Sequence, residues 1–220
     1  MAGALETAAR ALDEAAEKGW DNEETAYEFA AAVAAVPIAL GLPIFFDHIG
    51  AKPGAYPPDP LLAVVGPVDV TWLTFIVLYG GITIAVTRVL RQPLLIARGL
   101  HAYAILQLLR AVCMELWTLE PPKDIIPLID PVTAAFYPGG IPFLKDLFFS
   151  GHTATLALTV CLARTRSERW MMITATITVG ALVILQHVHW TVDVLAAPVF
   201  VWLAWRASAF SLKLFGVEGA

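Results

Sequence analysis

The stretch that decides the fold is the apolar run at residues 70–90, VTWLTFIVLYGGITIAVTRVL, whose one charged residue, Arg88, lies close to its end. About 17–25 apolar residues in helical conformation cross a hydrocarbon layer about 30 Å thick. Further apolar runs occur at about 29–46, 97–118, 147–164, 170–187 and 191–210. The sequence therefore predicts an all-α, polytopic membrane protein with six transmembrane helices.

The composition of the 220-residue chain agrees with a lipid environment. Hydrophobic residues make up 58% of the chain and charged residues 15%, and the mean hydropathy is +0.70. Soluble domains contain about 45–50% apolar residues, so a water-soluble fold of this size could not bury all of this apolar surface. Cys113 and Cys161 both lie within apolar runs, which favours packing roles over a disulfide.

The segments outside the predicted spans divide the chain simply. Residues 1–26 predict a short extramembrane amphipathic helix, too acidic for a signal peptide. Residues 27–210 form the predicted membrane catalytic domain, and 211–220 a cytoplasmic tail. The connection at about 119–146 is rich in proline and predicts repeated turns. The net charge of −5 comes largely from the N-terminal stretch, so we expect no nucleic-acid partner.

Lysine and arginine predict the orientation, because short basic loops stay in the cytoplasm. Ten basic residues lie in the two terminal tails and in the second-to-third and fourth-to-fifth connections. They are Arg10, Lys18, Arg88, Arg91, Arg98, Arg164, Arg166, Arg169, Arg206 and Lys213. The other connections hold Lys52, Lys123 and Lys145. With six spans, both termini are therefore predicted to be cytoplasmic.

Ionisable side chains at membrane depth mark functional sites, because inserting each one costs about 2.5–3.5 kcal/mol. Here they gather at the non-cytoplasmic ends of the third, fourth and sixth predicted spans: Arg110, Glu115 and Glu120; His152; and His187, His189 and Asp193. We therefore expect one site on the non-cytoplasmic face of the membrane.

The residue types in this set favour phosphoryl transfer. If the sixth span is helical from about residue 188, His189 and Asp193 are i and i+4 on one face, and the carboxylate can orient the imidazole. An oriented imidazole is a nucleophile or general base, and a second histidine, His152, can supply a proton to a leaving group. Ser150 and Gly151 precede His152 at a predicted helix start, a geometry that attracts phosphate.

At these residues the chain resembles the sphingomyelin synthase-like family of the type 2 phosphatidic acid phosphatase superfamily. The resembling segments are DLFFSGHT at 146–153 with LALT at 156–159, and HVHWTVDV at 187–194; a weaker one is RAVCMELWTLEPP at 110–122. The resemblance covers about residues 60–205. It implies six spans, cytoplasmic termini and an active site facing away from the cytoplasm, in a bacterial inner membrane or a Golgi or plasma membrane.

The resemblance also implies a mechanism. His189, oriented by Asp193, attacks the phosphorus of a phospholipid donor, giving a phosphohistidine intermediate and releasing diacylglycerol. His152 protonates the leaving alcohol and then takes a proton from the acceptor, a lipid alcohol such as ceramide. With water as acceptor, the same residues make a phosphatase or a phospholipase C-like hydrolase. Substrate contacts are expected from Ser150, Gly151, Asp146, Arg110 and His187, and no cofactor is implied.

Departures from the phosphatase branch favour a phosphodiester substrate. That branch has a Lys-x6-Arg-Pro segment and a Ser-Arg pair before its last histidine, whereas this chain has no Arg-Pro dipeptide and has Leu182-Val183 in place of the pair. Arginines of this kind bind the dianion of a phosphate monoester. Without them, a singly charged phosphodiester is the expected substrate.

The sequence leaves other interpretations to be weighed. Arg110 either contacts phosphate or pairs with Glu115 or Asp146. A metal site at His187 and His189 is disfavoured, because helical residues two apart point about 200° apart. A non-catalytic lipid-binding or scrambling protein is a further alternative. A transporter would place its ionisable groups nearer the bilayer midplane.

Overall fold

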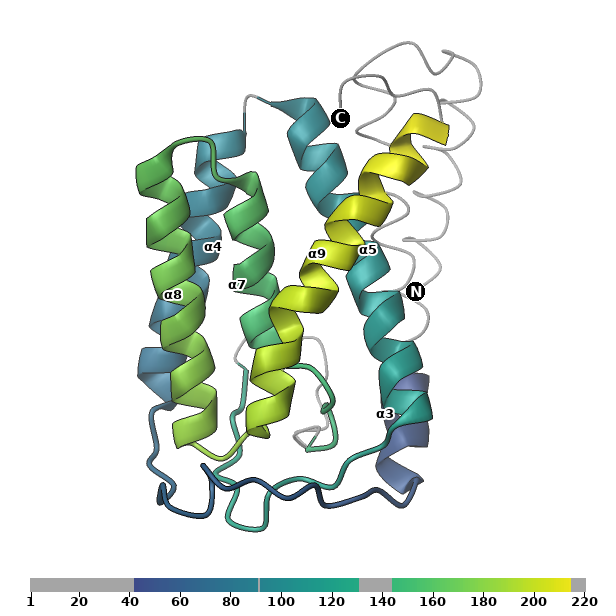
Figure 1. Ribbon diagram of the computed structural model, residues 1–220, viewed down its shortest axis with the longest axis vertical. Helices are drawn as coiled ribbons and strands as arrows, with labels where there is room; N and C mark the ends of the chain where they lie inside the picture. Colours follow the sequence, from purple (N-terminus) through teal and green to yellow (C-terminus); the bar gives the residue numbers. More distant parts are fainter. Residues whose placement is uncertain (1–41, 91, 131–143, 215–220) are drawn as a thin grey trace.

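The computed structural model describes residues 42–90, 92–130 and 144–214, and its regular elements there are helices (Figure 1). These are α3 (Leu42–Ala51), α4 (Thr71–Val89), α5 (Pro93–Leu116), α7 (Gly151–Leu162), α8 (Arg166–Leu185) and α9 (Thr191–Leu214). Within these ranges, one parallel bridge joins Ala55 to Leu119. The predicted all-α class is confirmed for these ranges.

Four of the described helices, α4, α5, α8 and α9, are long and apolar enough to cross a membrane. The predicted fourth span is shorter than expected, because residues 147–150 are not helical and α7 has 12 residues, or about 18 Å of helix. Most of the predicted first span, and all of segment 1–26, lie outside the described residues. α3 continues to Ala51, beyond the predicted end at 46, and α9 continues to Leu214, beyond 210.

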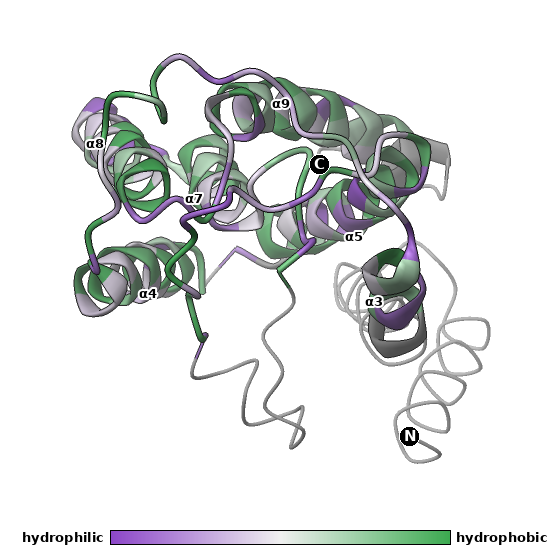
Figure 2. Cartoon of the chain, turned by 90° about the horizontal axis from the view of Figure 1, so that it is seen from below, coloured by the Kyte–Doolittle hydropathy of each residue, from purple (hydrophilic) through white to green (hydrophobic). Residues whose placement is uncertain are grey.

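The short helix α7 lies at the centre of the bundle, where it packs against α4, α5, α8 and α9 (Figure 2). One apolar cluster, built on Ala102, Leu106, Ala154, Ala157, Leu158, Ala197, Val201 and Ala204 with Phe149, joins it to α5 and α9. Its alanines let the helix backbones approach closely, as is common between membrane helices. α7 is therefore largely enclosed by protein, which accommodates a helix too short to span the hydrocarbon layer.

Three connections, 52–70, 117–130 and 186–190, lie together at one end of the bundle, at the bottom of Figure 1. Gln186 holds them to one another and is fully buried. Its side chain accepts a hydrogen bond from the N–H of Val70 (3.2 Å) and donates to Thr71 Oγ1 (2.8 Å) and to the carbonyl of Ile126 (3.3 Å). These connections form the frame that holds the candidate site.

Candidate active site

His189 lies in the turn between α8 and α9, two residues before the helix. α9 begins at Thr191, where the predicted sixth span begins, so the helical i, i+4 spacing considered for His189 and Asp193 is absent. The expected contact with Asp193 nevertheless forms, with His189 Nδ1 3.3 Å from Asp193 Oδ2. Asp193 is the third residue of α9, and the same Oδ2 accepts the N–H of Trp190 at 3.2 Å. A helix cap of this kind, not helical periodicity, therefore brings the carboxylate to the imidazole.

The pair is buried, with the His189 and Asp193 side chains 3% and 0% exposed. A carboxylate only accepts hydrogen bonds, so in the neutral imidazole Nδ1 carries the proton and Nε2 holds the free lone pair. Asp193 Oδ1 is also buried and has no hydrogen-bond partner among the described residues. The carboxylate is thus placed to stabilise positive charge on the imidazole ring.

His152 is the second residue of α7, and Ser150 caps that helix by accepting the N–H of Thr153 at 3.3 Å. The rings of His152 and His189 are neighbours, with centroids 6.1 Å apart in an edge-to-face arrangement. The N–H of Ser150 donates to the carbonyl of Asp193 at 3.0 Å, which joins the start of α7 to the start of α9. The structure therefore brings both predicted histidines into one site.

Arg110 reaches the start of α7 from α5 and is 7% exposed. Its Nε donates to the carbonyl of Phe149 at 3.3 Å, and its guanidinium forms an ion pair with Asp146. A Cβ atom added at Gly151 would lie 2.7 Å from the guanidinium carbon, so only glycine leaves room for this arrangement. Of the two alternative ion-pair partners considered from the sequence, Asp146 pairs with Arg110, whereas Glu115 pairs with His48 and Lys52.

Glu115 and Glu120 make ion pairs elsewhere at this end of the bundle. Glu115 Oε1 is 2.7 Å from Lys52 Nζ, while Glu120 Oε1 accepts from Lys145 Nζ and from the N–H of Gly54, both at 2.8 Å. The hydrogen bond from Lys145 lowers the pKa of the Glu120 carboxyl by more than its partial burial raises it. Glu115 therefore joins α5 to the end of α3, and Glu120 joins loop segments.

His187, predicted to contact substrate, is buried and has a backbone partner. Its Nε2 is 2.7 Å from the carbonyl oxygen of Val65, and its φ is +55°, in the left-handed region. The N–H of His187 bonds the carbonyl of Ile184, and that of Val188 bonds the carbonyl of Val183, both at 2.9 Å. These two bonds form a Schellman motif that ends α8, with His187 in the position that glycine usually takes.

Asp59 and Gln186 are residues of this site that sequence reasoning missed. Asp59 lies among prolines in the connection 52–70 and accepts hydrogen bonds from the N–H and hydroxyl of Thr191, at 2.6 and 2.9 Å. Neither residue is part of a spacing pattern that would have found it, because their partners lie far away along the chain. Within the described ranges, no group of three or more His, Cys, Asp or Glu residues is arranged to hold a metal ion.

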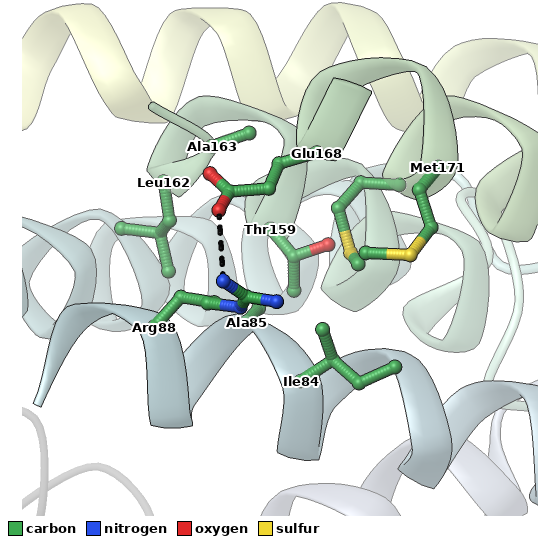
Figure 3. Close-up of a pocket in the computed structure, with 9 residues that line it drawn as sticks. Ile84, Ala85, Arg88, Thr159, Leu162, Ala163, Glu168 and Met171 are labelled. Atoms are coloured by element: carbon green, nitrogen blue, oxygen red, sulfur yellow. Dashed lines mark ion pairs between the residues drawn. The ribbon is translucent and has the colours of Figure 1, made fainter. Parts of the chain in front are cut away.

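A small pocket of about 10 Å³ lies near the opposite end of the bundle, between α4, α7 and α8 (Figure 3). Arg88 Nη1 and Glu168 Oε1 form an ion pair at 3.7 Å across it. Its lining is mostly apolar, including Ile84, Leu162 and Met171. It is too small for a lipid headgroup, and none of the candidate active-site residues lines it.

Comparison with protein families matches residues 145–210 to the family model described as PAP2 superfamily C-terminal. That range contains Asp146, Ser150, His152, His189 and Asp193, whereas α5 and the connection 52–70 lie outside it. The match and the four long apolar helices fit a multi-pass membrane protein. None of the curated proteins and none of the solved structures compared with the chain matches it.

Proposed function

We propose that the protein is an integral-membrane lipid phosphotransferase, which moves the headgroup phosphoryl moiety of a phospholipid donor to a lipid alcohol, as its resemblance to the sphingomyelin synthases implies. The observation that carries the proposal is the buried His189–Asp193 pair beside His152 at the start of α7. Members of the superfamily matched at 145–210 are generally phosphatases and phosphotransferases, which supports this class of reaction.

In the first step, His189 Nε2 forms a bond to phosphorus while the bond from phosphorus to the diacylglycerol oxygen breaks. The electron pair of that bond goes to the oxygen, and His152 in its protonated form donates the proton that yields diacylglycerol. Asp193 stabilises the positive charge that develops on the His189 ring, since Nδ1 faces its carboxylate. The product on the enzyme is a phosphohistidine carrying the headgroup.

In the second step, His152 accepts a proton from the acceptor hydroxyl, whose oxygen attacks phosphorus as the bond to Nε2 breaks. His152 thus alternates between acid and base, and His189 returns to its starting state. A lipid alcohol as acceptor gives a transferred headgroup, and water gives hydrolysis. The alternative function is therefore a phosphatase or phospholipase C-like hydrolase, which the products distinguish.

The charges near α7 support a phosphodiester substrate. The first N–H groups of α7, at Gly151 and His152, attract an anion because they begin a helix. The guanidinium of Arg110 lies beside them, but its ion pair with Asp146 offsets much of its charge. This arrangement suits a phosphate with one negative charge better than a monoester dianion. We place the site on the non-cytoplasmic face, in keeping with the basic-residue distribution.

The test is phosphoryl labelling in lipid bilayers, using purified protein and a donor with a labelled headgroup. We expect an acid-labile, base-stable label on His189 by mass spectrometry, and no label and no turnover in His189→Ala. His152→Ala should still be labelled by a nitrophenyl phosphodiester, whose leaving group needs little protonation. A matched control is His48→Ala, because His48 pairs with Glu115 outside the site and its loss should leave the label unchanged.

Specific results would overturn the proposal. Label on another residue, or full activity in His189→Ala, would show that His189 is not the nucleophile. Hydrolysis of phosphatidic acid much faster than of any glycerophospholipid would favour the phosphatase. Lipid binding without turnover under every donor and acceptor would favour the non-catalytic alternative.

A further inference from the structure

The connection 52–70, hereafter the 52–70 loop, crosses the end of the bundle that holds the candidate site (Figure 1). It is fastened to the segment just before His189. His187 Nε2 is hydrogen-bonded to the carbonyl oxygen of Val65 at 2.7 Å. The N–H of Val68 donates to the carbonyl of Leu185 at 3.0 Å. The loop is thus part of the frame that positions the α8–α9 turn.

Within this loop, Asp59 makes hydrogen bonds to the first residue of α9. Its Oδ2 accepts the N–H of Thr191 at 2.6 Å, and its Oδ1 accepts the Thr191 hydroxyl at 2.9 Å. Oδ1 also accepts the N–H groups of Leu61 and Leu62, at 3.1 and 3.2 Å. With four hydrogen bonds, the carboxylate is held firmly in its own loop while it binds the first residue of α9.

The contact lies between the two members of the proposed nucleophilic pair. Thr191 follows His189 by two residues and precedes Asp193 by two. Asp193 closes the same turn from inside the helix by accepting the N–H of Trp190. A negative charge at a helix N-terminus is also favourable, because the helix dipole is positive there. The first turn of α9 is therefore held by Asp59 from the 52–70 loop and by Asp193 from within the helix.

We propose that Asp59 is a positioning residue for phosphoryl transfer: through Thr191 it holds the first turn of α9 where the Asp193 carboxylate reaches the His189 ring. The inference rests on the proposed function. The distance from His189 Nδ1 to Asp193 Oδ2, 3.3 Å, is long for a charge-assisted hydrogen bond, which is about 2.7–2.9 Å. A small outward shift of the turn would therefore break it.

The chain offers a matched control in Asp69, which belongs to the same loop. Asp69 Oδ1 accepts the N–H of Thr71 at 3.0 Å, and Thr71 is the first residue of α4 just as Thr191 is of α9. The two aspartates thus perform the same capping chemistry on two different helices. α4 carries none of the residues proposed to react, so only the Asp59 cap should affect catalysis.

The experiment measures kcat, KM and thermal unfolding of the full-length protein in bilayers, with a natural phospholipid and a nitrophenyl phosphodiester as donors. In Asp59→Asn we expect kcat to fall on the order of 10- to 100-fold with both donors, because a shift of about 1 Å at the site costs about that much. KM should hardly change. Thr191→Val keeps the 2.6 Å bond from its N–H and should lose less, and Asp69→Asn should keep wild-type kcat.

A double variant decides whether Asp59 acts through Asp193. If it does, Asp59→Asn combined with Asp193→Asn should be no slower than Asp193→Asn alone, because both changes remove the same interaction. Three results would each overturn the inference. The first is a double variant whose kcat loss is the product of the two single losses, and the second is an equal kcat loss in Asp59→Asn and Asp69→Asn. The third is a raised KM with unchanged kcat in Asp59→Asn. A wild-type protein without turnover would overturn the proposed function itself.

Discussion

Gly151 is the residue whose side chain, a single hydrogen, makes room for Arg110. An added Cβ would lie 2.7 Å from the guanidinium carbon and from Nη1, and 2.9 Å from Nη2. The guanidinium is the far end of a flexible side chain, so the fold can accommodate alanine there by moving it. That movement would cost Arg110 its place beside Asp146 and the Phe149 carbonyl.

We therefore expect Gly151→Ala to fold normally but to lower kcat/KM for a phosphodiester lipid by roughly 10- to 100-fold, equivalent to one hydrogen bond to a charged group of about 1.5–3 kcal/mol. Gly80→Ala is the control, because nothing lies within 4 Å of an added Cβ at that position of α4. Wild-type kcat/KM in Gly151→Ala would mean that the position of Arg110 does not affect the reaction.

The turn between α8 and α9 depends on His187 adopting a left-handed conformation, with φ of +55°. Asparagine tolerates this conformation, whereas a β-branched residue does not. We expect His187→Val to lower the free energy of unfolding by about 1–3 kcal/mol more than His187→Asn. Thermal unfolding in detergent measures the difference, and equal stabilities would contradict the assigned turn geometry.

His187→Asn also tests whether the His187 ring contacts substrate, as the sequence predicts. In the structure the ring bonds the Val65 carbonyl, a role that the shorter asparagine cannot reproduce at the same distance. A raised KM in a stably folded His187→Asn would support the substrate contact. An unchanged KM would indicate that the ring only holds the 52–70 loop, through the Val65 carbonyl.

The loop-to-loop contact made by Glu120 should make stability depend on pH. Its hydrogen bond from Lys145 lowers the pKa of the carboxyl in the folded protein below the usual value of about 4.3. A carboxyl of this kind stabilises the fold above its unfolded pKa, and the stabilisation is lost as the pH falls through its folded pKa. On acidification from about pH 6 to about pH 3, the melting temperature of wild type should therefore fall more than that of Glu120→Gln. Parallel curves would show that this pair contributes nothing.

At the scale of the whole molecule, the connections occupy opposite ends of the bundle (Figure 1). The 52–70 loop, segment 117–130 and the α8–α9 turn lie at one end, and the α7–α8 connection lies at the other. This is the division that the basic residues predict, since Arg164, Arg166 and Arg169 belong to the second end.

A reporter inserted in the α7–α8 connection should therefore be cytoplasmic, as should one fused to the C-terminus, while a reporter between Pro121 and Pro127 should be on the other side. Protease protection or a compartment-specific enzyme fusion measures the location. Finding the α7–α8 and Pro121–Pro127 reporters in one compartment would contradict the predicted orientation and the placement of the site on the non-cytoplasmic face.

The sequence by itself determined the helical class and the four long spans. It also indicated His152 and His189 as the two histidines of the candidate site. These features are readable because hydrophobic length is a property of a continuous stretch, and because His152 and His189 lie in short, recognisable segments. The predicted ends of the long spans at 70–90, 97–118, 170–187 and 191–210 agree with the observed helices to within four residues. Local chemistry was sufficient for each of these conclusions.

Only the tertiary structure decided how the polar groups pair. It placed His189 before α9, so that a helix cap and not helical spacing joins it to Asp193. In the fold, Arg110 pairs with Asp146 and not with Glu115, and Asp59 contacts Thr191, which lies 132 residues further along the chain. The physical reason is that a buried polar group bonds whichever partner the packing of distant elements brings within reach, and sequence spacing does not record that packing.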